Sequence, residues 1–498
     1  MVSDNMRKEL IREINVIQRP ARAVTWRIGL VYPNSYSVGM SGLSIKLLYH
    51  LLNQHQQVFA ERIFKPREPF LIPKSLETQK PLNNFDILMF TFQFELDYIN
   101  AIKMLHQSSI PVYTKDRNCS HPLIIAGGPV ITANPEPILE IFDFVFIGEF
   151  ESVGESFIKT LLDSEQNSLG ESIASIPGFH DINSYSKSVK PLITPQLDAV
   201  NYPTAQVRPL SKQKKKGILD GFFLQVSRGC PHGCHYCLIS KIFRPHRERS
   251  LEKLVEIILK GKESTETDYF SLIGSSTADY SKINELLNFF NDNKLRFTLP
   301  SIRVDSGNDL LDSLNRSGQK SLTIAPETGS DETRHSVGKR ITNEEIVSFA
   351  TRAFTNNIRN LKAYFILGLT PDPMKELQDI NNLVKELKQS VPLMKYKISL
   401  TPLIPKKHTR FSRSCINYES ITMAHKAMKK NFTIPAPYKI FPIRWAVIQA
   451  ILSVGGREIA PIMVEIATRG GGSYQSWKKK LDNDPMKFYQ VNYCKDTI

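Results

Sequence analysis

The 498 residues include 64 Lys and Arg against 49 Asp and Glu, which gives a formal net charge of +15, and 41% of them are hydrophobic. This composition excludes a disordered chain, and no run reaches the roughly 18 apolar residues of a membrane-spanning helix. A chain of this length exceeds one ordinary core, so we expect two or three domains. The positive charge is spread along the chain, and we therefore expect only weak, salt-sensitive nucleic-acid binding.

Two features indicate a cytoplasmic protein. Cys119, Cys415 and Cys494 are scattered, which argues against a disulfide framework and for a reducing compartment. The N-terminus lacks the apolar core of a secretory signal; its apolar residues instead fall on one helical face, so residues 1–25 are expected to form a docking helix. These residues are Met6, Leu10, Ile14 and Ile17.

Residues 26–160 show the alternation of a doubly wound, Rossmann-like α/β domain. Short apolar runs, which we expect to be strands, alternate with longer helical stretches. The expected strands are 27–32, 85–91, 123–126 and 142–147, and the expected helices are 43–52 and 96–105. Ligands of such parallel sheets bind beyond the carboxyl ends of the strands.

These expected strand ends are rich in turn residues and mark a candidate binding edge. Glycines there let a large flat cofactor approach the backbone, although ordinary turns between strand and helix would explain any one of them. The candidate residues are Tyr32, Asn34, Gln93, Gly127, Gly128, Pro129, Gly148 and Glu149.

The periodicity fades over 161–220, which we expect to be a linker, and the basic run Lys212 to Lys216 within it is expected to be a solvated loop. Residues 221–415 then alternate six strands with helices, a pattern typical of an incomplete, (β/α)6 version of the TIM barrel. The expected strands are 222–226, 269–273, 296–303, 321–325, 361–367 and 397–402. Residues 416–498 are expected to form a helical C-terminal region.

Cys230, Cys234 and Cys237 follow the first strand of this barrel at the spacing CxxxCxxC. A structural zinc site takes four protein ligands and an electron-transfer [4Fe-4S] cluster takes four cysteines, so three thiolates leave one metal position open to a small molecule. A zinc knuckle and unrelated buried thiols are the alternatives. The neighbouring His232 and His235 are not interpreted as ligands, because the three cysteines already complete such a site.

The CxxxCxxC loop after a strand, with Tyr236 before the last cysteine, resembles the radical S-adenosylmethionine enzymes. This resemblance implies that the three cysteines hold a [4Fe-4S] cluster and that its open iron chelates S-adenosylmethionine. It also implies that residues at the later strand ends cradle that cofactor. The expected contacts are Tyr236, Gly274, Ser275, Ser301, Arg303, Glu327, Ser330 and Arg334. Arg334 is expected either to pair with the cofactor carboxylate or to form an ion pair with Asp331 and Glu332 on its own helix.

Residues 26–160 resemble the cobalamin-binding domain that precedes the barrel in one large branch of these enzymes. The resemblance rests on the segments 94–100, 127–136 and 143–149. It implies that cobalamin binds at the candidate edge. The chain has no Asp-x-His-x-x-Gly motif, whose histidine ligates cobalt from below, so the lower ligand of the cobalt stays open.

Together these resemblances imply a cobalamin-dependent radical S-adenosylmethionine methyltransferase that methylates an unactivated carbon. No catalytic acid or base stands out, and ordinary structural roles explain Asp305 and His335. A polypeptide is the expected substrate, such as a glutamine of methyl-coenzyme M reductase, and a ferredoxin- or flavodoxin-like protein is the expected electron donor.

Two alternative functions stay open. The first is cyclisation or coupling of a membrane lipid with the same cofactors. The second is methylthiotransfer to RNA or protein, which is disfavoured because the enzymes that catalyse it carry three further N-terminal cysteines. Only Cys119 precedes the motif in this chain.

Replacing Cys230, Cys234 and Cys237 together with alanine should abolish the cluster, because these thiolates would hold its iron. We expect anaerobic reconstitution to load one cluster into the unmodified protein and none into this variant, as measured by iron and sulfide content. The matched control replaces the three scattered cysteines with alanine and should load normally. A full cluster in the motif variant would contradict the assignment.

Overall fold

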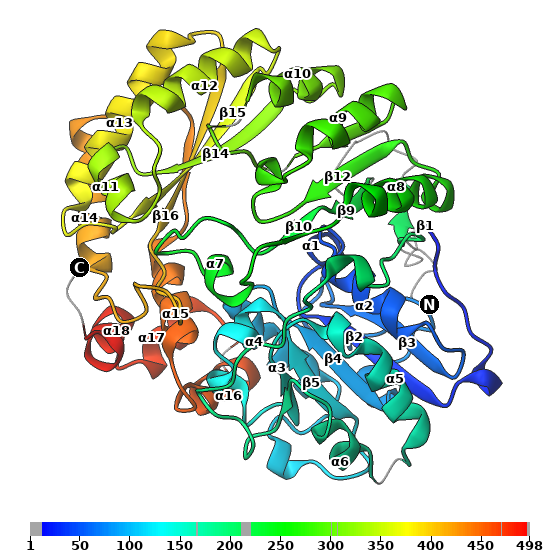
Figure 1. Cartoon of the computed structure of the whole chain (residues 1–498). Helices are drawn as coiled ribbons and strands as arrows, with labels where there is room; N and C mark the ends of the chain where they lie inside the picture. The colour runs from blue at the N-terminus through cyan, green and yellow to red at the C-terminus, as the bar shows by residue number, and fades with distance from the viewer. Residues whose placement is uncertain are drawn as a thin grey trace, which may run out of the picture.

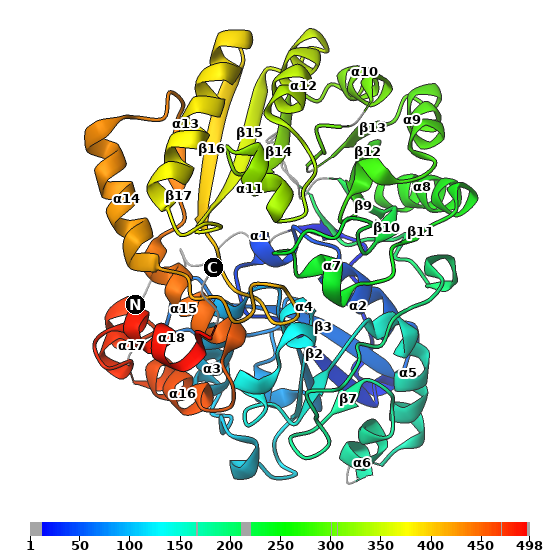
Figure 2. The same cartoon turned by 60° about the vertical axis from the view of Figure 1, so that its left-hand side comes forward.

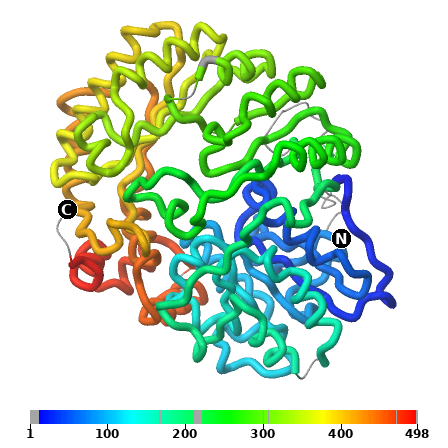
Figure 3. The backbone as a smooth tube through the Cα atoms, in the orientation of Figure 1, coloured from blue at the N-terminus to red at the C-terminus, as the bar shows by residue number. Residues whose placement is uncertain are grey.

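The computed structural model describes residues 12–165, 168–210, 221–299, 301–305, 307–469 and 471–495. Two α/β bodies lie one above the other, and the earlier part of the chain forms the lower one (Figures 1 and 3). The last helices, coloured red, return to the side of the lower body (Figure 1). The contact between the two bodies therefore joins segments that lie far apart in the sequence.

The lower body is built on a six-stranded sheet with the order β3-β2-β4-β5-β6-β7. All neighbours are parallel except β7, which pairs antiparallel with β6. This is the strand order of a flavodoxin-like doubly wound sheet, so the expectation of a doubly wound domain is confirmed. The strands are β2 Trp26–Tyr32, β3 Val58–Phe64, β4 Ile87–Thr91, β5 Leu123–Gly127, β6 Phe144–Phe146 and β7 Phe179–His180. The helices are α1 Tyr36–Gly39, α2 Ser44–Leu52, α3 Tyr98–Gln107, α4 Pro129–Ala133, α5 Gly154–Asp163 and α6 Leu169–Ala174.

The central strands of this sheet are buried on both faces. Every residue of β3 and β4 is buried, and in β2 only Arg27 is half-buried. Strands of this kind form continuous apolar runs, which is why most of them were evident from the sequence. Sequence analysis missed β3, because Glu61 and Arg62 interrupt its apolar pattern.

The expected docking helix is wrong for the described residues before Trp26. Glu13–Ile14 form the strand β1, which pairs antiparallel with β8, Arg208–Pro209. The Glu13 carboxylate lies 2.7 Å from the buried guanidinium of Arg62, and Glu77 pairs with the same group at 2.7 Å. A buried cation requires such partners. The ion pair of Glu13 with Arg62 therefore holds this segment extended, although its apolar spacing favoured a helix.

The expected linker, 161–220, begins inside the lower body. Phe179 of β7 packs against Phe146 and Phe157, with ring centroids 4.9 and 5.6 Å apart. The chain then crosses the carboxyl edge of the sheet, where Leu192 forms backbone hydrogen bonds with residues 147 and 149. A two-residue strand carries too little pattern to be found from sequence. The basic run 212–216 lies outside the described residues.

The upper body is an incomplete barrel in two parallel sheets, β13-β12-β9 and β14-β15-β16-β17. The six expected strands are present, which confirms the partial barrel. The three-residue β17 is an additional parallel strand, so the barrel sheet continues beyond residue 415 into the region expected to be helical. The strands are β9 Phe222–Gln225, β12 Tyr269–Ile273, β13 Arg296–Thr298, β14 Ser321–Glu327, β15 Asn360–Leu367, β16 Lys395–Pro402 and β17 Tyr438–Ile440. The helices are α7 Ile239–Ile242, α8 Leu251–Thr265, α9 Ile283–Asp292, α10 Asn308–Arg316, α11 Asp331–Ser336, α12 Asn343–Thr355, α13 Pro373–Ser390 and α14 Tyr418–Asn431.

The C-terminal helices join the two bodies along one side (Figure 2). They are α15 Ile443–Val454, α16 Ile459–Thr468, α17 Tyr474–Lys480 and α18 Pro485–Tyr493. Gln449 of α15 donates to Glu95 of the lower body at 2.8 Å, and Lys406 of the loop after β16 pairs with the same carboxylate. Within the described residues, no helix is long and apolar enough to cross a membrane.

Replacing Phe179 with alanine should lower the free energy of unfolding by about 3–5 kcal/mol, because it leaves a cavity among four packed rings. Phe70, which is 92% exposed, is the matched control, and Phe70→Ala should change little. Denaturant titration followed by tryptophan fluorescence measures both variants. An equal loss in the two would contradict the assignment of β7 to the core.

Candidate functional site

The three cysteines lie on a loop that a short hairpin holds at the barrel mouth. The strands β10 Ser227–Arg228 and β11 Arg247–Glu248 pair antiparallel on either side of the loop. Gly229 has φ 79°, and a Cβ there would lie 2.4 Å from the carbonyl oxygen of Phe243, so glycine is required. The thiols that line one cavity of about 200 Å³ beside this loop are those of Cys230, Cys234 and Cys237.

The histidines of this loop are engaged with other groups. His232 Nε2 lies 2.7 Å from Asp279 Oδ2, and the His235 ring contacts a guanidinium from the loop after β16.

Burial raises the pKa of the Cys230 and Cys237 thiols above the ordinary value of a cysteine. In the part of the chain that the structure describes, no three His, Cys, Asp or Glu side chains form a group suited to a single metal ion. A [4Fe-4S] cluster does not require such a group, because each of its thiolates binds a separate iron atom.

The rest of this cavity is formed by residues at the ends of β12, β13 and β14. The predicted S-adenosylmethionine contacts that line it are Tyr236, Ser275, Ser301, Arg303 and Glu327. Glu327 has φ 69°, an uncommon left-handed conformation, where β14 shifts register against β15. Its carboxylate accepts a hydrogen bond from Lys339 Nζ at 2.9 Å. Burial, with the charges of Glu327 and Cys234, raises the pKa of the Tyr236 phenol, so the phenol stays a hydrogen-bond donor.

Arg303 brings a positive charge to the same cavity. It forms a 2.7 Å ion pair with Asp305, a residue for which sequence analysis expected only a structural role. Burial lowers the pKa of Arg303, but the hydrogen bond and charge of Asp305 outweigh burial and raise it, so the guanidinium stays charged. With Glu327 in the wall, the cavity offers groups of both signs to a ligand.

Three predicted S-adenosylmethionine contacts, Gly274, Ser330 and Arg334, do not line this cavity. The Arg334 side chain is fully buried, with 0% solvent exposure. Its donors are taken up at 2.6–3.0 Å by acceptors on Pro326, Thr328, Asp331, Ile341 and Asn343. The structure therefore favours the ion pair with Asp331, and Arg334 ties the turn after β14 to α12. Ser330 instead caps α11, where its hydroxyl accepts from the backbone of Thr333.

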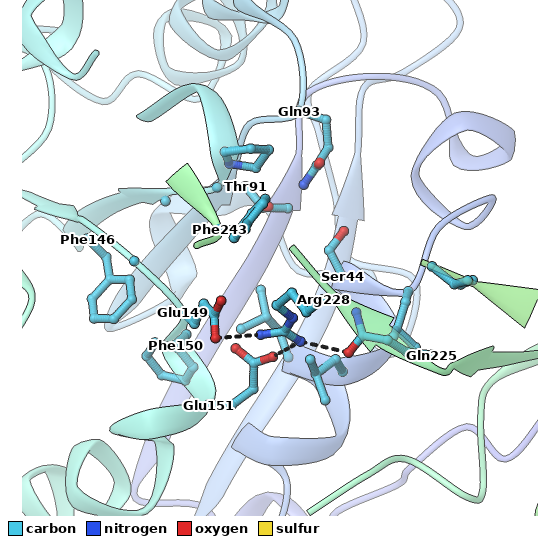
Figure 4. Close-up of a pocket in the computed structure, with 18 of the residues that line it drawn as sticks. Ser44, Thr91, Gln93, Phe146, Glu149, Phe150, Glu151, Gln225, Arg228 and Phe243 are labelled. Atoms are coloured by element: carbon cyan, nitrogen blue, oxygen red, sulfur yellow. Dashed lines mark hydrogen bonds and ion pairs between the residues drawn. The ribbon is translucent and has the colours of Figure 1, made fainter. Parts of the chain in front are cut away.

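A second cavity, of about 420 Å³, lies between the carboxyl edge of the lower sheet and the barrel mouth (Figure 4). The residues of the predicted cobalamin edge that line it are Gln93, Gly127, Gly128, Pro129, Gly148 and Glu149. Gly274 and Ser275, predicted as S-adenosylmethionine contacts, line it as well. The lining residues that sequence analysis missed include Ser44, Leu47, Phe150, Glu151, Gln225, Arg228 and Phe243. Ser44 and Leu47 lie in the first turn of α2, Phe150 and Glu151 directly follow the predicted Glu149, and the others come from the other body. A local turn signal does not place residues of the other body at this edge.

Tyr32 and Asn34 end β2 but do not line this second cavity. Asn34 donates to Asp97 Oδ1 at 2.8 Å, and the Tyr32 ring packs against Phe64. Gly39 of α1 lies directly on these rings, because a Cβ there would be 3.0 Å from Tyr32 and 2.4 Å from Phe64. The helix that follows β2 thus covers this strand end, and the cavity forms over β4, β5 and β6.

Two glutamates and two arginines form a buried ionic network between the bodies. Figure 4 shows the part of this network in which Arg228 pairs with Glu149 and Glu151. Glu149 lies 2.7 Å from Arg247 and 3.1 Å from Arg228, and Arg228 lies 2.5 Å from Glu151. Burial raises the pKa of Glu149, but the hydrogen bond from Arg247 and the charges of both arginines outweigh it, so the pKa lies below its ordinary value. Glu149, predicted as a cofactor contact, thus also holds the interface.

Ser275 lines both cavities. It follows β12, and Gly274 before it lets this strand end approach the hairpin, since a Cβ at Gly274 would lie 2.8 Å from Ser227 Oγ. The two cavities therefore adjoin.

The fold and the site define a class of protein: a partial barrel whose three-cysteine loop faces a doubly wound domain. Residues 44–179 match the N-terminal family of radical SAM proteins, and residues 224–384 match the radical SAM superfamily. The uncharacterized protein MJ0966 of Methanocaldococcus jannaschii is 30% identical over 408 residues, which cover 81% of this chain and 83% of that protein. The chain belongs to the radical SAM superfamily, whose cofactors are S-adenosylmethionine and a [4Fe-4S] cluster.

Two solved structures share this fold. The radical S-adenosylmethionine methyltransferase TsrM from Kitasatospora setae, solved with tryptophan and aza-SAM, has a TM-score of 0.53 and 12% identity over 92% of this chain and 98% of TsrM. The cobalamin-dependent enzyme OxsB, solved with aqua-cobalamin and S-adenosylmethionine, has a TM-score of 0.52 and 15% identity over 83% of this chain and 57% of OxsB. At these identities the likeness establishes the fold.

Glu149→Gln should lower the free energy of unfolding by about 3–5 kcal/mol at neutral pH, because it leaves buried arginine charge without its partner. The pKa of Glu149 is depressed in the folded state, so its contribution is present above the unfolded pKa and is lost as pH falls through the folded pKa. We therefore expect the difference from the unmodified protein to shrink below about pH 4.

Denaturant titrations over a pH series measure this difference. The exposed Glu155 on α5 supplies the control, and Glu155→Gln should have little effect at any pH. A loss for Glu149→Gln that does not change with pH would show that the carboxylate charge is not what matters.

Proposed function

We propose that this chain is a cobalamin-dependent radical S-adenosylmethionine methyltransferase that methylates an unactivated carbon. The observation that carries the proposal is the pair of cavities that share Ser275, one beside the cysteines and one on the edge of the doubly wound domain. A radical source and a methyl donor that act on one substrate carbon require two such adjoining sites. The fold shared with TsrM, solved with cobalamin and a [4Fe-4S] cluster, supports the proposal.

The residues around the first cavity fit its two cofactors. Three thiols on one loop match a cluster with one open iron. Arg303 suits the carboxylate of S-adenosylmethionine, and Glu327 suits its ammonium group, because each offers the opposite charge from the cavity wall. These residues would bind and orient the cofactor.

The residues around the second cavity fit cobalamin. Most of its lining is apolar, as in many cofactor sites, and the glycine-bearing strand ends leave the backbone accessible. A Cβ at Gly127 would have its nearest neighbour 3.7 Å away, so this position leaves space on the sheet edge. Among the described residues that line the cavity there is no histidine or cysteine. This domain would therefore give the cobalt neither an imidazole nor a thiolate.

When bound, S-adenosylmethionine with the cluster would supply hydrogen abstraction, and cobalamin would supply the methyl group. The chain's own contribution is to aim the reactants and to exclude water. Apolar side chains such as Phe243 and Ile273 line the space next to Ser275, and the buried network of Glu149 closes one wall. This chemistry needs no general base, and the titratable groups His232 and Glu327 of the first lining are already paired, with Asp279 and Lys339 respectively.

We include in the proposal a polypeptide substrate, such as a glutamine-bearing segment, and an external electron donor. The donor is supported by the cysteine count, because only three cysteines lie outside the motif and they are far apart in the sequence. These cysteines are too few for a second four-cysteine cluster, which supports a ferredoxin- or flavodoxin-like partner as the electron source.

Gly127→Leu should abolish cobalamin retention while leaving the cluster intact, because its side chain would fill the edge of the second cavity. The protein is reconstituted with hydroxocobalamin, desalted and examined by visible absorbance and iron content. Gly170→Leu on α6, where the nearest atom to a Cβ is 3.9 Å away, is the control and should retain cobalamin.

Failure of the unmodified protein to retain near-stoichiometric cobalamin would end the methylcobalamin mechanism. Electron paramagnetic resonance of the cob(II)alamin state tests the ligand separately. We expect no nitrogen superhyperfine pattern from a protein imidazole. Such a pattern, lost on substitution of a histidine, would contradict the ligand assignment but not the binding.

A further inference from the structure

The inner face of the second barrel sheet carries cations that the proposed chemistry does not use. Along β15 and β16, alternate residues are buried beneath helices, while the intervening ones are half-buried or exposed and face the barrel interior. Figure 2 shows α13 and α14 on the outer side of these strands. Lys362 of β15 and Lys397 of β16 are both inward positions, and the strand register places them directly opposite each other.

A third lysine lies one level higher on the same face. Lys439 of β17 is in register with Ser399, the next inward residue of β16 after Lys397. Its neighbour Tyr438 contacts the ring of His425 on α14, so Tyr438 faces outward and Lys439 inward. We call Lys362, Lys397 and Lys439 the lysine cluster.

No carboxylate on this face balances the lysine cluster. Of the described inward residues of β14 to β17, only Glu327, at the end of β14, is acidic, and it pairs with Lys339. The inward residues are Ser321, Thr323, Ala325, Glu327, Asn360, Lys362, Tyr364, Ile366, Lys395, Lys397, Ser399, Thr401 and Lys439. Among the described ion pairs, none includes a member of the lysine cluster. Lys362 instead lies over the Tyr364 ring, 4.3 Å from its centroid.

The usual structural explanations do not account for this arrangement. Lysines protect exposed edge strands from further pairing, but β15 and β16 are paired on both sides, so this explanation fits only Lys439 of β17. Like charges directly opposite each other on neighbouring strands are destabilising. The pair of Lys362 and Lys397, which lie opposite each other in a half-open interior, therefore suits an anion that binds between them.

We propose that the barrel interior binds an anionic group of the substrate, a carboxylate or a phosphate, at the lysine cluster. The inference rests on the proposed function, because it places this group in the same barrel whose strand ends carry the chemistry. Strands rise about 3.3 Å per residue, so Lys362 lies about 13 Å below Ile366 at the top of β15. The anionic group and the reacting carbon would therefore be separated by roughly that length.

The test is calorimetric titration of the reconstituted full chain with inorganic phosphate and with succinate at low ionic strength. We expect binding that the double variant Lys362→Gln, Lys397→Gln weakens at least about tenfold, as loss of charge-assisted contacts predicts. The matched control, Lys385→Gln with Lys388→Gln, removes two exposed lysines from the outer face of α13 and should bind as the unmodified protein does. Lys397→Arg keeps the charge and should retain binding. Tighter binding of phosphate identifies a phosphate-bearing substrate, and tighter binding of succinate a carboxylate.

Stability provides a second readout. In buffer without these anions, the double variant should raise Tm because it removes the repulsion, whereas the α13 control should not. The inference is overturned if neither anion binds the unmodified protein, or if the double variant and the α13 control bind equally well. Iron and cobalamin contents of the same samples report on the proposed function separately, so loss of anion binding with both cofactors retained concerns the lysine cluster alone.

Discussion

The ionic network of Glu149, Glu151, Arg228 and Arg247 is the contact on which the rest of the site depends. The two arginines face each other in register across the hairpin that carries the cysteine loop, and the two glutamates follow β6 of the lower sheet. Neither arginine could be buried there without a carboxylate from the other body, because an unpaired buried charge costs several kcal/mol. The network therefore fixes where the cysteines lie relative to the sheet edge, which is more important than any net stability it adds.

A second set of polar contacts does the same on the opposite side. Glu95, buried in the lower body, accepts from Lys406 of the barrel and from Gln449 of α15. Asn134, after α4, donates to the carbonyl oxygens of Ser453 and Gly455 at the end of α15. With the two bodies tied at both sides, the space between them keeps its shape. The second cavity and its junction with the first at Ser275 follow from this geometry.

Much of this arrangement could be predicted from the sequence, for physical reasons that also explain what could not. The buried strand β2 is a nearly continuous apolar run, and β15 buries every second residue, so both give clear sequence patterns. The spacing of the three cysteines likewise predicts that they bind one cluster. The short strands β7 and β17 depend on tertiary pairing, which leaves no periodicity. Arg334 looked like a cofactor contact because its surroundings could not be seen, and Tyr32 lies at a strand end that its own following helix covers.

The cationic side chains of this molecule differ in whether a carboxylate of the chain pairs with them. Arg62, Arg228, Arg247 and Arg334 each meet at least one carboxylate of the chain. The buried Arg249 instead donates to the carbonyl oxygen of Leu197 and lies over the Tyr202 ring. Lys362 and Lys397 have no carboxylate partner among the described residues, although they lie side by side on paired strands inside the barrel. Lys397 and Lys439 are exposed to solvent, which makes lysines without a carboxylate partner tolerable in the free protein. A bound anion would supply to these lysines the opposite charge that carboxylates of the chain supply to those four arginines.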